Sequence, residues 1–369
     1  MNFPPLAIII TSNEPWGDVW FSKQHYANEL ALLGYEVYFL NPHREWSPSN
    51  LFSFSVTQKT ISAKLTVISY KNNFPIRVFP TLFLKLNDLF NSWKIKKATR
   101  QKKLVIWWQF DPFRFVNIHF FSNIKRIYHI VDPYQHIWSD KEIEKKADIL
   151  VSVSNYYLND YKASKKPYLY IPHGISFSEE KIDPAATVEI HSQYGDYHII
   201  FVGTVTADVD LELLAEFAKE LPQYKMLLIG PLALADSEKY LFNELCQLPN
   251  VIYSGSVHSS ALKNFISLAK VGIVPYKNKL IENKHRTPLK IMNYLAQNLP
   301  TVTTINFELQ ELNDRYIFVA ESKAKFIEHI KLLLEGKIQT DRGDLNRFKD
   351  KVRYPVLIET ILKALFSAA

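Results

Sequence analysis

The segment VGIVPYKNKLIENKHRTPLKIMNYLAQNLPTVTTI, residues 271–305, decides the fold because it predicts a strand, a loop, a helix and a second strand in succession. Val271–Pro275 is a short apolar run, which is typical of a buried parallel strand. Thr287 and Pro288 predict a helix start, since a hydroxyl caps free N–H groups and proline suits the first helical position. The β-branched residues Thr301–Ile305 predict the next strand.

The predicted helix start carries groups that suit an anion. A helix N-terminus presents unpaired N–H groups and a partial positive charge. Arg286 and Lys290 flank this start, and Asn293 follows Lys290 by three residues, so the last two share one face of the helix. Such a face suits a phosphate and a sugar hydroxyl. An ordinary surface helix with solvated basic residues is the alternative, and composition alone favours it.

The same segment resembles the donor-nucleotide motif of GT-B glycosyltransferases, in which P-x-K opens a hydrophobic helix that ends in A-x-x-x-P-x-V. The matching residues here are Pro288, Lys290, Tyr294, Leu295, Ala296, Pro300 and Val302. Upstream, HIIFVGTV (198–205), KMLLIGP (225–231) and NVIYSGSV (250–257) follow in the order and spacing of such a domain. The resemblance covers the second half of the chain and implies that this half binds a nucleoside diphosphate sugar.

The sequence departs from the family pattern in two places. Many retaining members carry two glutamates seven residues apart, and the matching positions here fall near Arg286 and at Asn293. The loop after Gly203, TVTADVD, also lacks the arginine and lysine that usually hold the diphosphate. Lys290 and Arg286 are therefore expected to hold it. These departures put a retaining mechanism in doubt and leave a catalytically silent relative as an open alternative.

Predicted strands alternate with predicted helices along the rest of the chain, which predicts an α/β fold with parallel sheets covered on both faces. The resemblance implies the GT-B arrangement, in which two Rossmann-like domains face each other across a cleft. We predict an acceptor-binding domain over residues 1–180, a nucleotide-sugar-binding domain over 181–341, and a C-terminal helix over 342–369 that returns to the first domain. The length of 369 residues suits two domains.

Ligands of open α/β sheets bind beyond the carboxyl ends of the strands, and this rule, with the resemblance, predicts the site residues. The predicted donor-binding residues are Gly203, Thr204, Gly230, Val257, Tyr276, Arg286, Thr287, Pro288, Leu289, Lys290 and Asn293. The predicted acceptor or cleft residues are Asn13, Trp16, Gln24, His25 and His173. A structural turn is the alternative for His173, and core packing is the alternative for Tyr276.

Asp132 is the predicted catalytic base. It closes the apolar stretch RIYHIVD and precedes Pro133 and Tyr134, so we expect a partly desolvated acid that accepts the proton of an acceptor hydroxyl. Direct attack by that hydroxyl inverts the anomeric centre. An Asp132 that merely caps the following turn is an equal alternative. Asp111, which precedes Pro112, is the second candidate for the base.

The sequence predicts neither a metal site nor a cofactor. Metal-ligand spacing is not evident, and Asp208 and Asp210 precede a helix, where acids stabilise the N-terminus. The single cysteine, Cys246, leaves no internal disulfide and fits a reducing compartment. The chain shows no run of eighteen apolar residues and no signal peptide, so we expect a cytoplasmic protein.

The excess positive charge lies in the first half of the chain. Residues 1–180 hold 22 Lys+Arg and 15 Asp+Glu, a net charge of +7, whereas residues 181–369 are neutral. Phe79–Lys103 combines apolar bulk with a basic end, which suits the interface of an anionic membrane. A core helix with a solvated end is the alternative. Since no nucleic-acid motif is visible, we expect peripheral attachment to the inner face of the cell membrane.

These features together predict an inverting, metal-independent glycosyltransferase. It would transfer a sugar from a nucleoside diphosphate, preferably UDP, to a lipid-linked or polysaccharide acceptor of bacterial surface glycans. DVWFSKQHYANEL, residues 18–30, resembles bacterial exopolysaccharide glycosyltransferases, including the glucuronosyltransferase of xanthan assembly. A silent relative that binds nucleotide or glycan as a partner subunit is the alternative. A nucleotide-sugar epimerase fits less well, because it needs several acids and histidines converging on the sugar.

Overall fold

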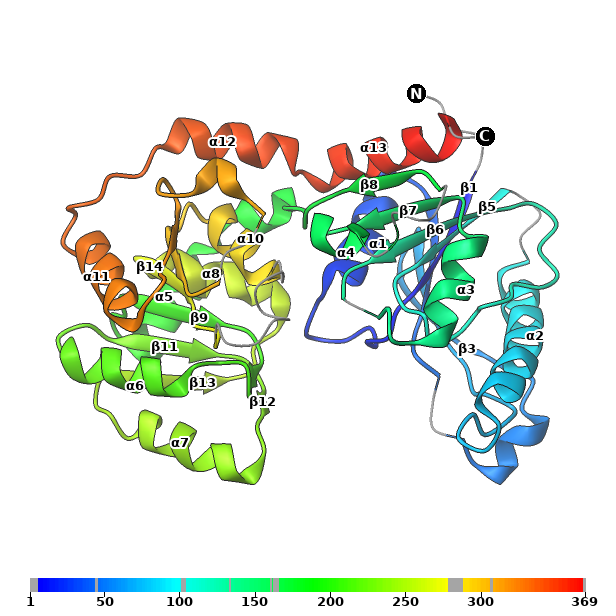
Figure 1. Ribbon diagram of the computed structural model, residues 1–369, viewed down its shortest axis with the longest axis horizontal. Coiled ribbons are helices and arrows are strands. Elements are labelled where there is room, and N and C mark those ends of the chain that lie inside the picture. Colours follow the sequence, from blue (N-terminus) through cyan, green and yellow to red (C-terminus); the bar gives the residue numbers. More distant parts are fainter. Residues whose placement is uncertain are drawn as a thin grey trace. The chain divides into compact units, whose positions relative to one another are not determined.

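The computed structural model describes residues 6–43, 46–100, 104–132, 134–159, 161, 166–277, 288–305 and 308–367. It divides into two compact units, residues 1–172 with 354–369, and residues 173–353, and each is described by itself. Each unit has a central, largely parallel sheet with helices on both faces (Figure 1), so the predicted α/β fold is confirmed.

The first unit is built on an eight-stranded sheet with the order β3-β4-β2-β1-β5-β6-β7-β8. The strands are β1 (Leu6–Thr11), β2 (Glu36–Leu40), β3 (Thr57–Ser62), β4 (Leu65–Ser69), β5 (Leu104–Gln109), β6 (Ile124–Ile130), β7 (Ile149–Ser152) and β8 (Tyr168–Tyr170). All neighbours pair in parallel except β3, which runs antiparallel to β4 at the edge. The sequence analysis missed β3 because its residues, TQKTIS, are mostly polar and exposed.

Helices cover both faces of this sheet because successive side chains of a strand point to opposite faces. In β1, Ile8 and Ile10 share a core with α1 and α13, whereas Ala7 and Ile9 share another with Ile95 of α2. The helices of the unit are α1 (Ser22–Leu32), η1 (Pro48–Phe52), α2 (Pro80–Thr99), α3 (Trp138–Lys146), α4 (Asn155–Asn159) and α13 (Tyr354–Ser367).

The second unit has a six-stranded, all-parallel sheet with the order β13-β11-β9-β14-β15-β16, and a short pair β10-β12. Its strands are β9 (Ile199–Val202), β10 (Val205–Thr206), β11 (Met226–Ile229), β12 (Leu232–Ala233), β13 (Val251–Gly255), β14 (Val271–Val274), β15 (Thr301–Thr303) and β16 (Ile317–Val319). Its helices are η2 (Phe177–Glu180), α5 (Pro184–Tyr194), α6 (Leu211–Glu220), α7 (Asp236–Cys246), η3 (Ser259–Ala261), α8 (Leu262–Leu268), α10 (Leu289–Ala296), η4 (Gln310–Leu312), α11 (Lys323–Leu334) and α12 (Arg342–Lys351).

The C-terminal stretch differs in detail from its prediction. Residues 342–367 form two helices rather than one, and only α13 packs in the first unit, against α1. The chain passes from the first unit to the second at His173 and returns at Tyr354. Tyr354 and Ile361 are fully buried in the core of the first unit, so burial of apolar side chains is what returns the chain there.

The segment that predicted the fold forms β14, α10 and β15, as expected. Gly272 in β14 lets the helix approach closely, because a Cβ atom there would lie 2.6 Å from the ring of Tyr294. The Tyr294 hydroxyl accepts a hydrogen bond of 2.9 Å from the backbone N–H of Val202 in β9. One detail was wrong: α10 begins at Leu289, and Pro288 occupies the N-cap position rather than the first helical position.

Candidate active site

Glycines shape the carboxyl edge of the second sheet, where β9 and β11 end. Gly203 and Gly230 have φ values of 136° and 139°, which L side chains rarely adopt. The N–H of Gly203 donates to Ile229 at 2.8 Å, and the N–H of Gly230 donates to Gly255 at 2.9 Å. A Cβ on Gly230 would lie 2.2 Å from the carbonyl oxygen of Gly203. The two strand ends therefore pack backbone against backbone, and only glycine fits.

Lys290 reaches this edge from the first turn of α10. Its ammonium donates a 2.8 Å hydrogen bond to the Tyr276 hydroxyl, and it lies 4.2 Å and 4.6 Å from the ring centroids of Phe201 and Tyr276. A Cβ built on Gly203 would lie 2.8 Å from the same nitrogen. Among the described residues, no carboxylate forms an ion pair with Lys290. A half-buried cation with neutral partners at a glycine-lined edge suits an anionic ligand.

Asn293 lies one turn after Lys290 and carries an unused acceptor. Its Oδ1 atom is buried and accepts no hydrogen bond from the described part of the chain. An unsatisfied buried polar atom costs about 1–3 kcal/mol, so native proteins tend to provide a partner for it. A hydroxyl of a bound sugar or ribose would satisfy this oxygen.

The other predicted donor residues form no side-chain hydrogen bond or ion pair with Lys290 or Asn293 in the described part of the chain. Thr204 follows Gly203 and Val257 follows β13, and both are half-buried. Leu289 is half-buried at the start of α10. Arg286 and Thr287 lie outside the described residues. The structure thus places Gly203 and Tyr276 beside Lys290.

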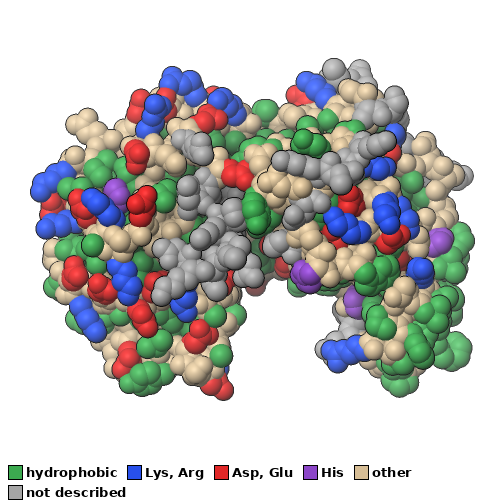
Figure 2. All heavy atoms as spheres, in the orientation of Figure 1, with side chains coloured by type: hydrophobic (Ala, Val, Ile, Leu, Met, Phe, Trp, Pro, Cys, Tyr) green, Lys and Arg blue, Asp and Glu red, His purple; other side chains and the backbone are tan. Residues whose placement is uncertain are grey.

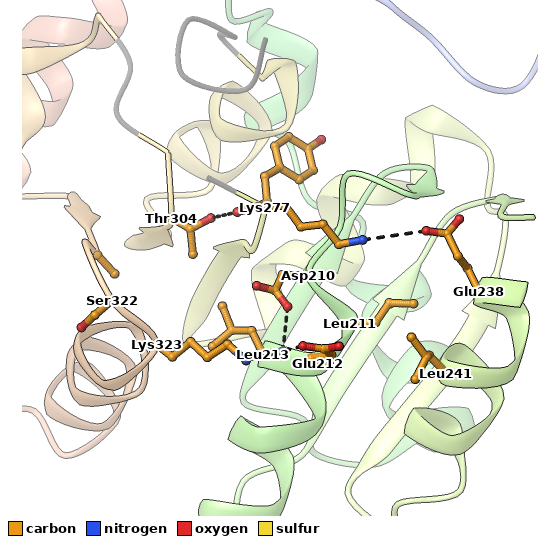
Figure 3. Close-up of a pocket in the computed structure, with 12 residues that line it drawn as sticks. Asp210, Leu211, Glu212, Leu213, Glu238, Leu241, Lys277, Thr304, Ser322 and Lys323 are labelled. Carbon is orange, nitrogen blue, oxygen red and sulfur yellow. Dashed lines mark hydrogen bonds and ion pairs between the residues drawn. The ribbon is translucent and has the colours of Figure 1, made fainter. Parts of the chain in front are cut away.

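A pocket of about 510 Å³ lies beside this edge, between the start of α6 and the start of α11 (Figure 3). Its lining residues are Asp210, Leu211, Glu212, Leu213, Glu238, Leu241, Tyr276, Lys277, Thr304, Ala320, Ser322 and Lys323. Figure 3 shows Lys277 extended towards Glu238, with 3.8 Å between Nζ and Oε1. Among the predicted donor residues that the structure describes, only Tyr276 lines this pocket. Because three carboxylates line it, the pocket suits a diphosphate less well than the Lys290 edge does.

Asp210 in that pocket has the structural role that the sequence predicted. Its Oδ1 atom accepts a 2.9 Å hydrogen bond from the N–H of Leu213 and so caps α6. Within the described residues, no group of three or more His, Cys, Asp and Glu side chains is arranged to hold a metal ion. None of the described helices is long and apolar enough to cross a membrane.

In the first unit, a chain of polar side chains joins the ends of β1 and β6. Lys23 Nζ lies 2.6 Å from Glu14 Oε2, and Asn13 donates to Glu14 Oε1 at 2.7 Å. Asn13 also lies 3.4 Å from the hydroxyl of Tyr134, which donates to Asp132 Oδ2 at 3.2 Å. The sequence analysis named Asn13 and Asp132 but missed Glu14 and Lys23, although Glu14 adjoins Asn13 in the post-strand loop.

Asp132 lies two residues beyond the end of β6 and is half-buried. Within the described residues, its carboxylate accepts only the bond from Tyr134, and no backbone N–H donates to it, so the turn-cap alternative has no support there. Burial, and then the negative charge of Asp132, raise the pKa of Tyr134 well above its usual value. Tyr134 therefore stays protonated and remains a donor to Asp132. Asn13 Oδ1 is buried without a described partner, like Asn293 Oδ1.

Asp111, the second candidate for the base, has a different environment. It is fully buried, its Oδ1 accepts a bond of 3.2 Å from the N–H of Phe113, and its Oδ2 lies 3.5 Å from Arg114 Nη2. Arg114 donates in turn to the carbonyl of Asn41 at 2.6 Å and to the hydroxyl of Tyr70 at 2.7 Å. This arrangement points to a structural ion pair and away from a base that meets an acceptor.

Trp16 and Gln24 support the loop after β1. The N–H of Trp16 donates to Asn41 Oδ1 at 2.8 Å, and its ring packs 5.1 Å from that of Phe39. Gln24 Oε1 accepts from the N–H of Phe21 at 3.0 Å, and its amide donates to the carbonyl of Pro15 at 3.0 Å. Both side chains therefore order the loop.

Of the two predicted histidines, His25 is half-buried and His173 is buried. His25 stacks on Tyr354, with 5.6 Å between ring centroids and 6° between planes. Burial lowers the pKa of His25 to about 4, so the ring is neutral at pH 7. His173 is 6% exposed and is the first residue of the second unit rather than part of the first.

Parts of the chain are similar to known proteins. Residues 196–336 match the family model described as "Glycosyl transferases group 1". The chain is 30% identical over 118 residues to the protein described as "Putative teichuronic acid biosynthesis glycosyltransferase TuaH" of Bacillus subtilis (strain 168). That match covers 32% of this chain and 29% of the relative's length.

Solved structures match nearly the whole chain in fold. Sucrose-phosphate synthase from Thermosynechococcus elongatus has a TM-score of 0.73 and 15% identity, with 98% of this chain and 100% of that chain covered. HepE of Anabaena, in complex with UDP-glucose, has a TM-score of 0.70 and 11% identity, with 98% and 99% covered. The predicted resemblance to GT-B glycosyltransferases is therefore confirmed: the fold is GT-B, and residues 196–336 are similar to the group 1 glycosyl transferase family.

Proposed function

We propose that this protein is a glycosyltransferase that takes a sugar from a nucleoside diphosphate sugar, preferably a UDP-sugar. The observation that carries the proposal is Lys290, a half-buried lysine without an ion-pair partner among the described residues, beside Gly203 in the region that matches the glycosyltransferase family model. In this proposal Lys290 binds the diphosphate and Asn293 Oδ1 accepts a hydrogen bond from a ribose hydroxyl. UDP-glucose bound to HepE supports the choice of nucleotide.

The proposed reaction is a single displacement without a metal or other cofactor. The acceptor hydroxyl loses its proton to Asp132, its oxygen forms a bond to the anomeric carbon, and the bond from that carbon to the diphosphate oxygen breaks. The nucleoside diphosphate leaves with the bonding electrons, and Lys290 stabilises its charge. Inversion at the anomeric carbon follows from one displacement. Tyr134 occupies Asp132 Oδ2, which leaves Oδ1 to accept the proton.

The acceptor in this proposal is a lipid-linked saccharide or a polysaccharide of the bacterial surface. The name of TuaH supports this choice, since it places that protein in teichuronic acid biosynthesis. Asn13 Oδ1 lacks a described partner and suits an acceptor hydroxyl. We further propose a cytoplasmic location at the inner face of the cell membrane, with anionic lipid as the partner of the basic first unit and with no nucleic acid bound.

A catalytically silent relative is the second candidate, and the donor site supplies the observation that favours it. Asn293 occupies the position where many retaining members carry a glutamate, and the loop after Gly203 has no cation. Such a protein would bind nucleotide or glycan as a partner subunit.

One experiment separates the two candidates. The protein is incubated with a panel of UDP-, GDP- and dTDP-sugars, and hydrolysis and binding are followed by chromatography and calorimetry. Hydrolysis of one UDP-sugar supports the transferase. Micromolar UDP binding without hydrolysis or transfer to any acceptor supports the silent relative. Absence of both binding and hydrolysis would overturn the proposal.

A further inference from the structure

Helix α2 buries several polar side chains while Leu82 and Trp93 are exposed, which is unusual for a surface helix. Its buried residues are Leu84, Asn87, Asp88, Asn91, Ser92, Lys94, Ile95 and Thr99. On the outer side Leu82 is 55% exposed, and Phe79 at the N-cap is 59% exposed. An apolar face turned to water costs free energy unless something covers it.

Neighbouring elements extend this face into one surface, which we call the α2 apolar surface. Its members are Leu51, Phe52, Phe54, Val78, Phe79, Leu82, Trp93 and Phe120, all large hydrophobic residues that are exposed. Phe52, at the end of η1, is 79% exposed. Figure 2 shows the hydrophobic side chains gathered on the part of the first unit that holds α2 and η1.

Ring contacts connect two members of this surface, Phe79 and Phe54, through three half-buried phenylalanines. The ring centroids of Phe79 and Phe83 lie 5.5 Å apart, and those of Phe83 and Phe74 lie 5.4 Å apart. Phe74 continues to Phe90 at 5.8 Å, and Phe90 to Phe54 at 6.0 Å. An open apolar groove of about 280 Å³ follows, lined by Phe54, Leu89, Phe90, Trp93 and Phe120. Contiguous apolar surfaces of this kind mark interaction sites, whereas single exposed residues do not.

Basic side chains border the surface at the C-terminal end of α2. Lys97 Nζ lies 5.2 Å from the ring centroid of Trp93, and Lys96 Nζ lies 5.0 Å from that of Phe121. Arg100 is exposed at the C-cap, and Lys85 is exposed along the helix. Aromatic and aliphatic side chains beside lysine and arginine match the interface of an anionic bilayer, where rings enter the headgroup region and cations meet phosphates.

Lys94 does not belong to this border, which corrects the expectation for Phe79–Lys103. It is 2% exposed and donates to the carbonyl of Lys71 and to Asn73 Oδ1, each at 2.7 Å. Asn73 Nδ2 lies 3.3 Å, 3.1 Å and 3.3 Å from the carbonyl oxygens of Asn50, Leu51 and Ser53. Lys94 therefore holds, through Asn73, the turn that presents Phe52.

We propose that the α2 apolar surface inserts into the interface of an anionic membrane, with Phe52, Phe79 and Leu82 as the inserted side chains and Lys97 and Arg100 on the lipid phosphates. The net charge of +7 over residues 1–180 favours an anionic lipid surface over a protein surface that carries little negative charge. The inference rests on the proposed function, which names the membrane as a partner. It deepens that function by naming the surface of the protein that binds the membrane.

The test is co-sedimentation with phosphatidylcholine vesicles that contain or lack phosphatidylglycerol. Phe52→Ser, Phe79→Ser and Leu82→Ser are expected to weaken binding to the anionic vesicles about tenfold each. Lys97→Glu with Arg100→Glu is expected to weaken it by a further tenfold or more, and added salt should mimic this change. Leu32→Ser is the matched control, since Leu32 on α1 of the same unit is 71% exposed but lies outside the surface.

Two outcomes would overturn the inference. One is vesicle binding that the three serine variants leave at the wild-type value, or that Leu32→Ser weakens equally. The other is a dimer in sedimentation velocity that the serine variants dissociate, which would assign the surface to a second copy. UDP affinity is measured on each variant. Unchanged UDP binding with lost vesicle binding supports the inference, whereas absent UDP binding in the wild type would count against the proposed function alone.

Discussion

Asn91 and Lys94 in α2 and Lys290 and Asn293 in α10 are lysine–asparagine pairs at the same spacing of three residues, and the fold treats them differently. In α2, Lys94 donates to Asn91 Oδ1 at 3.2 Å and to two further oxygens, so the fold satisfies the pair internally. In α10, Lys290 has only neutral partners and Asn293 Oδ1 has none among the described residues. The comparison teaches that spacing alone does not identify a site. A site is where the fold leaves hydrogen-bonding capacity unused.

Two aspartates of the first unit differ in burial and in charge partners rather than in unused hydrogen-bonding capacity, since Asp111 Oδ2 also lacks a hydrogen-bond partner. Asp111 is fully buried beside Arg114, whereas Asp132 is half-buried and accepts one bond from Tyr134. If unused capacity marks the site, substitutions at Asp132, Lys290 and Asn293 should change function. Substitutions at Asp111 and Lys94 should change stability.

The largest effect is expected for Asp132→Asn. The amide keeps the shape but cannot accept the proton, so transfer should fall by about 10² to 10⁴. The measurement is the rate of transfer to the acceptor, together with NMR of the product, which should show an inverted anomeric centre. Asp111→Asn is the control and should lower thermal stability while the remaining folded enzyme stays active. Near-normal turnover of Asp132→Asn, or a retained anomeric centre, would contradict the assignment.

Lys290→Met should have the second-largest effect. The methionine keeps the packing on Phe201 and Tyr276 but removes charge-assisted bonds worth about 1.5–3 kcal/mol, so UDP affinity should fall about 10- to 150-fold. Calorimetry with UDP measures it, and the thermal midpoint should change little. Lys323→Met, in the neighbouring pocket, is the matched control. If Lys323→Met weakens UDP binding and Lys290→Met does not, the nucleotide occupies the pocket instead of the edge.

Lys94→Met should produce the opposite pattern. Three oxygen acceptors in and around α2 would lose their donor, and the free energy of unfolding should fall by about 1–3 kcal/mol. Denaturant unfolding measures this, and UDP affinity should stay at the wild-type value. Lys85→Met, which replaces an exposed lysine of the same helix, should leave stability unchanged. Equal stability of the Lys94 and Lys85 variants would break the comparison between the two lysines.

Asn293→Ala should have the smallest effect. One neutral hydrogen bond is worth about 1 kcal/mol, so UDP affinity should fall about fivefold. Because Oδ1 has no described partner, stability should stay the same or rise slightly. Titration with UDP and with uracil sharpens the prediction, since only the ligand that carries a ribose should distinguish the variant from the wild type. An equal loss for both ligands would remove Asn293 from the ribose.

The sequence by itself determined the parallel α/β fold and the β14–α10–β15 unit, because apolar runs and helix-start signals act locally. It also predicted that Asp210 stabilises a helix N-terminus, an interaction confined to the four consecutive residues 210–213. It identified Asn13, Asp132, Lys290 and Asn293 as post-strand or helix-start groups, because the carboxyl ends of parallel strands meet at one edge.

Tertiary structure alone decided which polar groups have hydrogen-bond partners within the folded chain. The sequence suggests that Lys94 is a surface charge. In the structure its ammonium donates a hydrogen bond to Asn73, which lies in a loop more than twenty residues away in the sequence. Glu14 follows Asn13 in the sequence, but Lys23 reaches Glu14 only because β1 and α1 place them together. The periodicity of α2 shows two faces but not which one the core covers. Satisfaction of a polar group depends on partners distant in sequence, so only the folded chain reveals what remains free for a ligand or a membrane.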